Sequence, residues 1–460
     1  MNPAVYCPDL VYSDGRFVSG HGVRVDAAGM IAGVGPLEPG ATGRVVRLEG
    51  KAMLPGLVNG HSHSFQRLIR ARAETRGASG NNFWTWRDTM YRAAQALDAD
   101  DVYDVARMTF LEMALAGITS VGEFHYVHKR PDGTTYDDPN ELSKKVIAAA
   151  RSVGIRICLL RVAYLRAGYK LPPNAGQTRF YETLPEYMEN IAALAREING
   201  GQHGVSMGAA PHSVRAVPLD AMKEIACWAA ERQLPVHIHA AEQRAENAAC
   251  GAEYGATSVQ LLARNGLLTE RSTLVHAIHI TPDEMDAIAD ADATVCSCPT
   301  TERNLGDGVV DAEAAIAKGI GFCFGSDSQA TIDLLEDARE LDCHLRLMRE
   351  QRVILDDVAG VDISQRLLGY ATAGGSKSLG LNAGELKPGA CADFFTVDLN
   401  DVSIAGAAAD ELTAAVVFGM NRTAVRDVVV GGEMIVSDGR HGLQEEIVRK
   451  YGEVSARVWR

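Results

Sequence analysis

Residues 52–63 read AMLPGLVNGHSH, an apolar run that closes with two histidines on either side of a serine. The run predicts a buried β-strand that ends at Leu57. In an extended chain the side chains of His61 and His63 point to the same side, about 6–7 Å apart at the backbone. Two imidazoles at that spacing can bind one metal ion. One such pair is weak support for a metal site, so further ligands must come from elsewhere in the chain.

Seven more apolar runs follow this one, and helical patterns separate them. The eight predicted strands end at Leu57, Phe124, Val162, Ala210, His239, His276, Ser297 and Asp327. Several helical stretches close with a glycine just before the next strand, as helix C-termini commonly do. Eight strands alternating with helices predict a parallel (β/α)8 barrel of the TIM type, here spanning residues 54–384. The active site of such a barrel lies at the carboxyl ends of its strands.

Histidines concentrate where these strands are predicted to end. Nine of the 13 lie there, namely His61, His63, His125, His128, His212, His237, His239, His276 and His279. Carboxylates accompany them at Glu123, Glu242 and Asp327. A chance distribution would scatter these residues along the chain. The carboxyl ends of the predicted strands are therefore the candidate site.

The two ends of the chain have a different pattern, with short alternating segments between glycine turns. This pattern is typical of short strands in a small β-domain. We predict a β-sandwich that takes its first part from residues 1–53. Its second part, together with a C-terminal helix, comes from residues 385–460. The expected architecture is α/β, with one large barrel and one small β-domain.

Composition limits the possible partners and location. The chain has 460 residues, is 47% apolar and carries a formal net charge of -14, which disfavours nucleic acid and anionic membranes as partners. No run approaches the roughly 18–20 apolar residues that span a bilayer. The first residues lack the pattern of a signal peptide, so a cytoplasmic protein is expected. Nine scattered cysteines fit reduced core residues, and we interpret Cys296 and Cys298 as core rather than as a thiolate site.

The histidine pairs can be combined into one metal site. His61 and His63 supply two ligands, the pair His237 and His239 lies on one face of another strand, and Asp327 ends the last strand. Two or three imidazoles with a carboxylate and an open position match a catalytic site for zinc or a similar divalent ion. Such an ion lowers the pKa of bound water to near 7.

Two further residues have positions that suit catalysis. Glu242 lies three residues after His239, where it could carry a proton to a leaving nitrogen. His276 ends the sixth predicted strand and could polarise a substrate atom. Taken alone, Glu242 is typical of a solvated acid at a helix start, and His276 of a buried hydrogen-bonded histidine. Their position beside the other strand-end residues favours the functional interpretation.

Several motifs in this chain resemble the amidohydrolase superfamily. They are residues 54–63, 237–242, 274–276, 325–328 and 384–393. Because no strand-end lysine is placed to bridge two metals, the chain is most similar to the mononuclear deaminase branch. That resemblance implies one divalent ion, most often Zn²⁺, and the ligands His61, His63, His239 and Asp327. It also implies three catalytic residues, Glu242, His276 and Asp327, the last taking a proton from the bound water.

Further motifs narrow the expected substrate. Residues 82–87, 123–128, 211–217 and 304–308 resemble deaminases of this family that act on a small linear amidine with two carboxylates. The resemblance implies substrate contacts from Gln66, Arg87, Tyr126, His212 and Arg215, and a homodimer. Arginine suits a carboxylate because it can bind both oxygens. Gln329 departs from relatives that have histidine at this position, so a proton-relay role there is in doubt.

Two other functions remain open at this point. A deaminase of the same branch could act on a purine, pyrimidine or triazine ring, which would need an aromatic slot more than two arginines. A non-catalytic binding protein on a degenerate barrel is the alternative from a different class. The intact set of predicted ligands argues against it, and metal analysis of the purified protein would decide.

Overall fold

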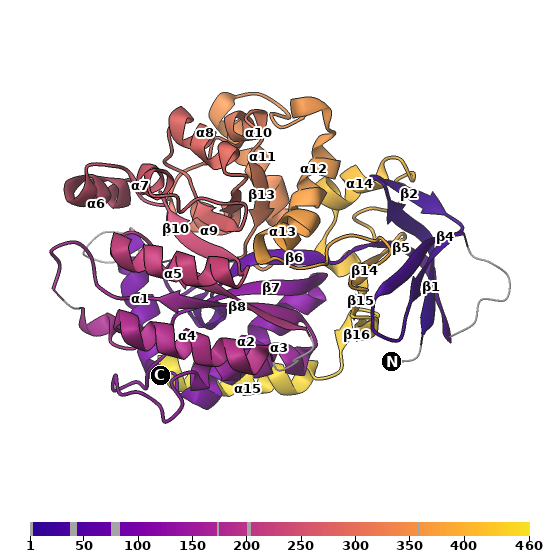
Figure 1. Cartoon of the computed structure of the whole chain (residues 1–460). Helices are drawn as coiled ribbons and strands as arrows, with labels where there is room; N and C mark the ends of the chain where they lie inside the picture. The colour runs from indigo at the N-terminus through magenta and orange to yellow at the C-terminus, as the bar shows by residue number, and fades with distance from the viewer. Residues whose placement is uncertain (1–2, 37–43, 75–82, 173, 200–203, 357) are drawn as a thin grey trace.

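The protein is described by a computed structural model that covers residues 3–36, 44–74, 83–172, 174–199, 204–356 and 358–460. Figure 1 shows a barrel ringed by helices and, beside it, a second sheet in which indigo N-terminal and yellow C-terminal strands lie together. The predicted barrel and the predicted β-structure built from both termini are both confirmed. None of the described helices is both long enough and apolar enough to cross a membrane.

Eight parallel strands form the barrel, each paired with the next along the chain. They are β6 (Leu57–Ser62), β7 (Ile118–His125), β8 (Arg156–Ala163), β9 (Val205–Pro211), β10 (Val236–Ala240), β11 (Ser272–His276), β12 (Thr294–Ser297) and β13 (Gly321–Phe324). The first and last strands meet through two backbone hydrogen bonds of 3.1 Å, from His63 N to Asp327 O and from Asp327 N to His61 O. The barrel therefore joins at its metal-binding motifs.

Helices follow the strands on the outside of the barrel. The main ones are α2 (Ala99–Leu115), α3 (Glu141–Val153), α4 (Leu184–Ile198), α5 (Leu219–Glu231), α6 (Arg244–Tyr254), α7 (Ser258–Arg264), α8 (Pro282–Asp290), α9 (Pro299–Leu305), α10 (Ala312–Ala317), α11 (Leu334–Arg349), α12 (Ile363–Gly369) and α13 (Gly375–Leu379). The start of α8 is fixed by local interactions, because Thr281 and Glu284 form a capping box and Pro282 is the first helical residue.

The first predicted strand was wrong in its boundaries. The apolar run of residues 52–63 serves two sheets: β5 (Arg44–Pro55) pairs with the C-terminal β14 (Phe394–Asp398), and β6 begins only at Leu57. The sheet changes at Gly56, where a Cβ atom would lie 2.2 Å from the Thr119 hydroxyl. The last strand likewise ends at Phe324 rather than at Asp327.

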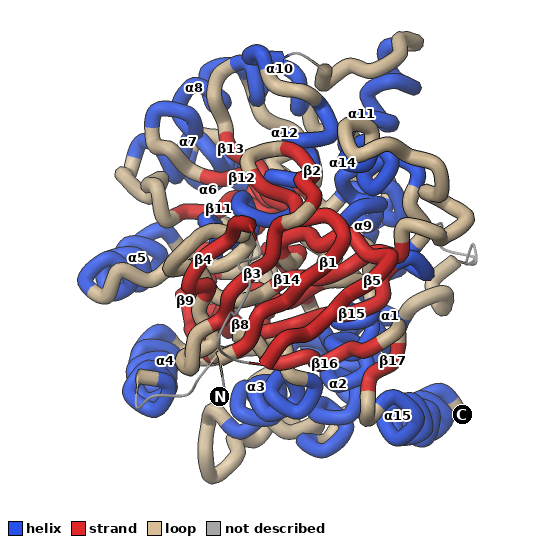
Figure 2. Tube along the Cα trace, turned by 90° about the vertical axis from the view of Figure 1, so that its right-hand side faces the viewer, coloured by secondary structure: helices blue, strands red, loops and turns tan. Residues whose placement is uncertain are grey.

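The second sheet has nine strands. Its order is β17 (Arg440–His441), β16 (Glu433–Ser437), β15 (Val425–Val430), β14, β5, β1 (Ala4–Ser13), β3 (His21–Val25) and β4 (Ile31–Pro36), with β2 (Arg16–Ser19) paired to β1. Figure 2 looks onto this sheet and shows the barrel helices around its margin. Tyr6 and Phe394 pack edge to face in its core, with ring centroids 4.9 Å apart.

The predicted C-terminal helix is α15 (Gln444–Trp459), which packs against α2. It also contacts the short 3₁₀ helix η1 (Ser64–Ile69), which directly follows the first metal-binding motif. Trp459 Nε1 donates to the carbonyl oxygen of Leu68 at 3.1 Å, and the Tyr451 hydroxyl lies 3.0 Å from an Arg67 nitrogen. The end of the chain therefore supports a segment that carries part of the pocket wall.

Candidate active site

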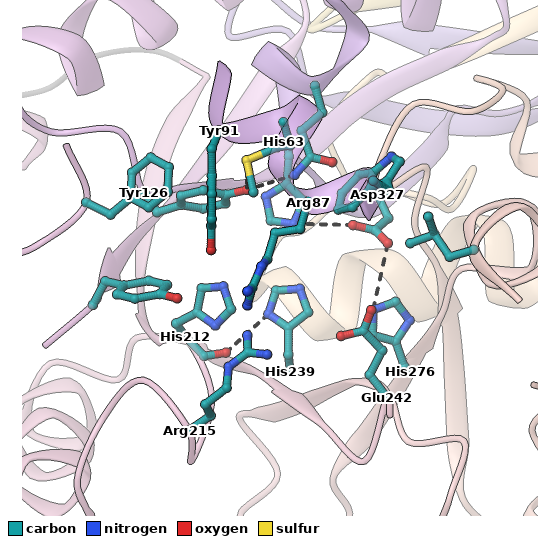
Figure 3. A pocket seen from close by; sticks show the side chains of 16 residues that line it. His63, Arg87, Tyr91, Tyr126, His212, Arg215, His239, Glu242, His276 and Asp327 are labelled. Carbon is teal, nitrogen blue, oxygen red and sulfur yellow. Dashed lines mark hydrogen bonds and ion pairs between the residues drawn. The ribbon is translucent and has the colours of Figure 1, made fainter. Parts of the chain in front are cut away.

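A pocket opens at the carboxyl ends of the barrel strands. Figure 3 shows the side chains that converge on it. They are His63, Gln66, Trp86, Arg87, Met90, Tyr91, Tyr126, Tyr164, Phe180, His212, Arg215, His239, Glu242, His276, Leu305 and Asp327. The pocket thus combines imidazoles and carboxylates with arginines and aromatic rings.

Four predicted ligands gather at the inner side of the pocket. Ligand atoms of His61, His63, His239 and Asp327 all lie within 4.8 Å of one another, and all four residues are buried. The Nε2 atoms of His61 and His63 are 3.1 Å apart, and Asp327 Oδ1 is 3.5 Å and 3.2 Å from them. Asp327 is far from His61 and His63 in the sequence. Closure of the barrel brings the three residues together in space.

Hydrogen bonds set the tautomers of two of these imidazoles. His63 Nδ1 donates to the Phe124 carbonyl oxygen at 2.9 Å, and His239 Nδ1 donates to the His212 carbonyl oxygen at 3.1 Å. The Nε2 atom of each ring is therefore left with a lone pair that points into the cluster. Burial lowers the pKa of His61 to about 3, so this ring is also neutral. Neutral imidazoles facing a carboxylate fit a divalent ion such as zinc.

His237 does not join this cluster. Its Nε2 atom donates to the carbonyl oxygen of Ser378 at 2.8 Å, and burial lowers its pKa to about 4. His237 and His239 share a strand face, but only His239 is at the strand end. The structure gathers three imidazoles, those of His61, His63 and His239, with Asp327.

The predicted catalytic residues form a second group beside the ligands. His276 Nε2 lies 3.9 Å from Glu242 Oε1 and 3.7 Å from Asp327 Oδ2. Its Nδ1 atom lies 3.2 Å from an oxygen of the buried Glu302. Burial alone would lower the pKa of His276, but the surrounding carboxylates of Glu242, Asp327 and Glu302 raise it to about 10. The ring of His276 therefore lies among three carboxylates.

Two of the predicted substrate contacts lie beside the predicted ligands, with ring centroids 5.1 Å apart for Tyr126 and His63 and 4.9 Å apart for His212 and His239. Gln66 Nε2 donates to the Tyr126 hydroxyl at 2.7 Å, and both side chains are buried. His212 lies beside Tyr126 and Tyr164, with ring centroids 5.8 Å and 4.8 Å away. Arg87 comes from α1 (Phe83–Ala96) and lies over the Tyr91 ring. The structure therefore brings these predicted contacts into the lining of one pocket.

Arg215 faces the same space from the loop after β9. Its Nε atom is buried and has no hydrogen-bond partner in the described part of the chain. A buried donor without a partner costs free energy unless a ligand supplies an acceptor. Arg215 is thus prepared to bind an anion.

Part of the aromatic motif at residues 82–87 cannot be placed. Residue 82 lies outside the described residues, and Trp86 and Arg87 line the pocket. Two residues that the sequence reasoning did not select also line it or support it. Tyr164 directly follows β8, and Glu302 lies in α9, which follows β12. The rule that functional residues follow barrel strands could have found both.

Gln329 braces the ligand loops. Its Nε2 atom donates to Ser62 Oγ at 3.0 Å and to the Asp327 carbonyl oxygen at 2.8 Å. Ser62 Oγ in turn donates to the buried Glu123 at 2.7 Å, and Glu123 also accepts from Ser64 N. The amide at position 329 therefore holds the two metal-binding segments together.

The backbone at these strand ends is unusual. Five residues other than glycine adopt left-handed φ values between 44° and 71°, namely Ala241, His276, Ala277, Asp327 and Gln329. Such conformations cost free energy and persist where the surrounding structure enforces them, often at active sites. Here they turn the chain at the ends of β10, β11 and β13, where the catalytic side chains lie.

Comparisons with known proteins find a matching family and similar sequences and structures. The amidohydrolase family model matches residues 52–435. The formimidoylglutamate deiminase of Pseudomonas aeruginosa is 38% identical over 94% of each chain. A 5-methylthioadenosine/S-adenosylhomocysteine deaminase of Natronomonas pharaonis is 27% identical over 89% of this chain and 86% of its own. The crystal structure of an amidohydrolase from Brucella melitensis superposes with a TM-score of 0.92 at 32% identity, covering 99% and 100% of the two chains.

Proposed function

Because this chain belongs to the amidohydrolase family, we propose that it hydrolyses N-formimidoyl-L-glutamate to N-formyl-L-glutamate and ammonia. The observation that carries the proposal is that acidic and basic side chains occupy different parts of the pocket. In Figure 3, Glu242 and Asp327 lie to the right of the pocket, Arg215 lies to the left, and Arg87 lies between them. A substrate with a cationic amidine at one end and two carboxylates at the other matches that arrangement. The 38% identity to a formimidoylglutamate deiminase supports the same choice.

His61, His63, His239 and Asp327 would hold one divalent ion, for which zinc is our choice. The converging lone pairs and the buried carboxylate fit it, and hydrogen bonds already orient two of the rings. A divalent ion held there lowers the pKa of water and acts as a Lewis acid.

The residues of the chain divide the chemistry between them. Asp327 would take a proton from the attacking water. Glu242 would deliver a proton to the amidine nitrogen, which leaves as ammonia. His276 lies between these two carboxylates, where its ring can donate a hydrogen bond to an oxygen or nitrogen attached to the tetrahedral carbon. Each role requires close approach to the reacting carbon, and all three side chains line the pocket.

Two arginines that line the pocket would bind the carboxylates of the substrate. Arg215 offers a buried, unused Nε donor, and Arg87 adds a second positive charge. Gln66, Tyr126 and His212 supply uncharged hydrogen-bonding groups near them. Charge-assisted and bidentate bonds to carboxylates are stronger than neutral ones.

The test is ammonia release from N-formimidoyl-L-glutamate beside a panel of adenosine, guanine and triazine compounds. We expect turnover of the linear substrate. Arg215→Met should raise KM at least tenfold, because one charged contact contributes about 1.5–3 kcal/mol. Arg232→Met, which removes an exposed arginine at the end of α5, is the matched control and should change neither constant. Equal KM values for the two variants would contradict the assignment of Arg215.

A ring deaminase is the second candidate. The aromatic lining of Trp86, Tyr91, Tyr126, Tyr164 and Phe180 favours it, as does the 27% identity to a nucleoside deaminase. Flat rings bind well against such side chains. Turnover of a ring compound with no turnover of the linear amidine would select this function.

A further inference from the structure

The two oxygens of Asp327 face different groups. Oδ1 lies 3.5 Å and 3.2 Å from the Nε2 atoms of His61 and His63, which belong to the first metal cluster. Oδ2 lies 3.7 Å from His276 Nε2. A carboxylate in this position can bridge two cations, because each oxygen is free to bind a different one.

Cys298 completes a second set of ligands on the Oδ2 side. Ligand atoms of His276, Cys298 and Asp327 lie within 4.8 Å of one another, and all three residues are buried. We propose that this set binds a second, thiophilic divalent cation, such as Cd²⁺ or excess Zn²⁺, which shares Asp327 with the first. Thiolate, imidazole and carboxylate are the ligands that such cations prefer. The sequence alone favours a core role for Cys298, and the proposal adds a role as a metal ligand.

The fold places Cys298 against the metal-binding strand. Cys298 follows β12 and precedes α9, and Gly325 of the last strand segment lies between it and His61. A Cβ atom at position 325 would be 3.0 Å from Cys298 Sγ and 2.7 Å from His61 Cβ. The absence of that atom lets the thiol approach the cluster closely.

The thiol is weakly engaged where it lies. Its sulfur is 3.9 Å from the carbonyl oxygen of Cys296 and also contacts the Cys296 thiol, and both are weak interactions. The backbone nitrogen of Cys298 donates to Glu302 at 2.8 Å, so the main chain is held while the side chain keeps its freedom to bind. Little would be lost when the sulfur turns to a cation.

The surroundings also favour additional positive charge. Four buried acidic residues, Glu242, Glu302, Asp307 and Asp327, influence the pKa of the buried His276 or of one another. Asp307 Oδ2 is buried and has no hydrogen-bond partner among the described residues. Buried carboxylates are stabilised when a cation pairs with them. A second divalent ion would supply such a partner, and its binding would release the Cys298 thiol proton and the Nε2 proton of His276 to solvent.

Occupation of this set would inhibit the enzyme. The second cation would take the Nε2 atom of His276 and one oxygen of Asp327, which the proposed deiminase reaction needs. This consequence rests on the proposed function, whereas the binding of the cation does not.

The experiment titrates Cd²⁺ into protein that carries one equivalent of Zn²⁺ per chain by elemental analysis. A Cys227→Ser background removes an exposed thiol. We expect a second equivalent of metal with Zn²⁺ retained, an ultraviolet cadmium–thiolate charge-transfer band, and loss of ammonia release. Cys298→Ser should abolish the band and raise the half-inhibitory Cd²⁺ concentration at least tenfold, relative to its own uninhibited rate. Cys323→Ser, in the same thiol cluster but outside the set, should keep the band.

Three results would overturn the proposal. They are the absence of a second equivalent in the parent protein, a band that persists in Cys298→Ser, and release of Zn²⁺ as Cd²⁺ enters, which would place cadmium in the first cluster. The band and the metal count use no substrate. A protein that gives both but does not turn over N-formimidoyl-L-glutamate would therefore retain the second site and refute only the deiminase assignment.

Discussion

At the scale of single residues, the proposed function depends on which buried polar atoms lack a hydrogen-bond or charge partner. Among the residues that the structure describes, none pairs with the buried Nε donor of Arg215, and His276 is surrounded by carboxylates. Arg161 shows the contrasting case at the end of β8: it is fully buried, yet Glu182 accepts two bonds from it at 2.7 Å and 2.8 Å. A satisfied charge of this kind stabilises the fold, whereas an unsatisfied one is available to a ligand.

Replacement of Glu242 by glutamine tests the proton-transfer role. The amide cannot carry the proton, so turnover should fall by about 10²–10⁴. Metal content and melting temperature should stay near those of the parent protein. Steady-state rates with elemental analysis measure both, and Glu224→Gln on the exposed face of α5 is the control. Near-full activity in Glu242→Gln would refute the assignment.

Replacement of Glu182 by glutamine tests the buried ion pair. Burial opposes ionisation of Glu182, but the charges of His128 and Arg161 dominate and lower its pKa from 4.5 to about 2. Loss of the carboxylate leaves Arg161 buried and unpaired, which should lower the free energy of unfolding by about 3–5 kcal/mol. Urea unfolding at neutral pH measures this change, and Glu189→Gln on the exposed side of α4 is the control.

The same pair predicts a pH dependence. A carboxyl group whose pKa is lowered in the folded state stabilises the protein fully above 4.5, and that contribution is lost as the pH falls toward 2. The difference in unfolding free energy between the parent and Glu182→Gln should therefore shrink as the pH is lowered from neutrality through this range. A difference that stays constant would show that the pair is not the cause.

At the scale of elements, the site depends on short segments that join two strands. The backbone bonds between Asp327 and residues His61 and His63 connect the last strand segment to the first. Gly325 lies within this junction, where a Cβ atom would meet His61 Cβ at 2.7 Å and His61 O at 2.9 Å. The metal ligands are therefore held in place by how closely two backbones approach.

Replacement of Gly325 by alanine tests this junction. The added methyl group must displace His61, so metal affinity should fall about 10–100-fold, as it does when groups that orient ligands are altered. Competition with a chromogenic chelator measures the affinity. Gly321→Ala is the matched control in β13, because a Cβ atom there has no neighbour within 4 Å. Equal affinities for the two variants would exclude the proposed role of the junction.

At the scale of the whole molecule, the ligands close the barrel. Three imidazoles from β6, β10 and their ends meet a carboxylate that follows β13, so a bound ion would link the first, fifth and eighth strands. The unfolded chain does not hold these groups together. Metal binding should therefore stabilise the folded state selectively. The expected homodimer stays a prediction.

Metal removal tests this link. Chelation should lower the melting temperature, and added Zn²⁺ should restore it; at 1,000 times Kd the ion contributes about 4 kcal/mol. Thermal unfolding across a zinc series measures the shift, and Asp327→Asn should lose most of it. A melting temperature that is independent of zinc in the parent protein would show that the cluster holds no ion.

The sequence by itself determined the parts of this protein that depend on local chain geometry. Alternating apolar strands and helices predicted the barrel, and His61 and His63, two residues apart in an extended segment, share a side wherever that segment lies. The predicted position of Glu242 and His276 after their strands also required no tertiary information. These features follow from backbone geometry over a few residues.

Only the tertiary structure decided which of these groups meet. It separated His239 from His237, moved the change of sheet to Gly56, and brought Cys298 beside His276 and Asp327. Strand pairing, barrel closure and the passage of one backbone past a glycine control these contacts, and all three act between residues far apart in the chain. Local sequence patterns do not determine these long-range contacts, because the same strands could pair and close in many ways that are compatible with the same patterns.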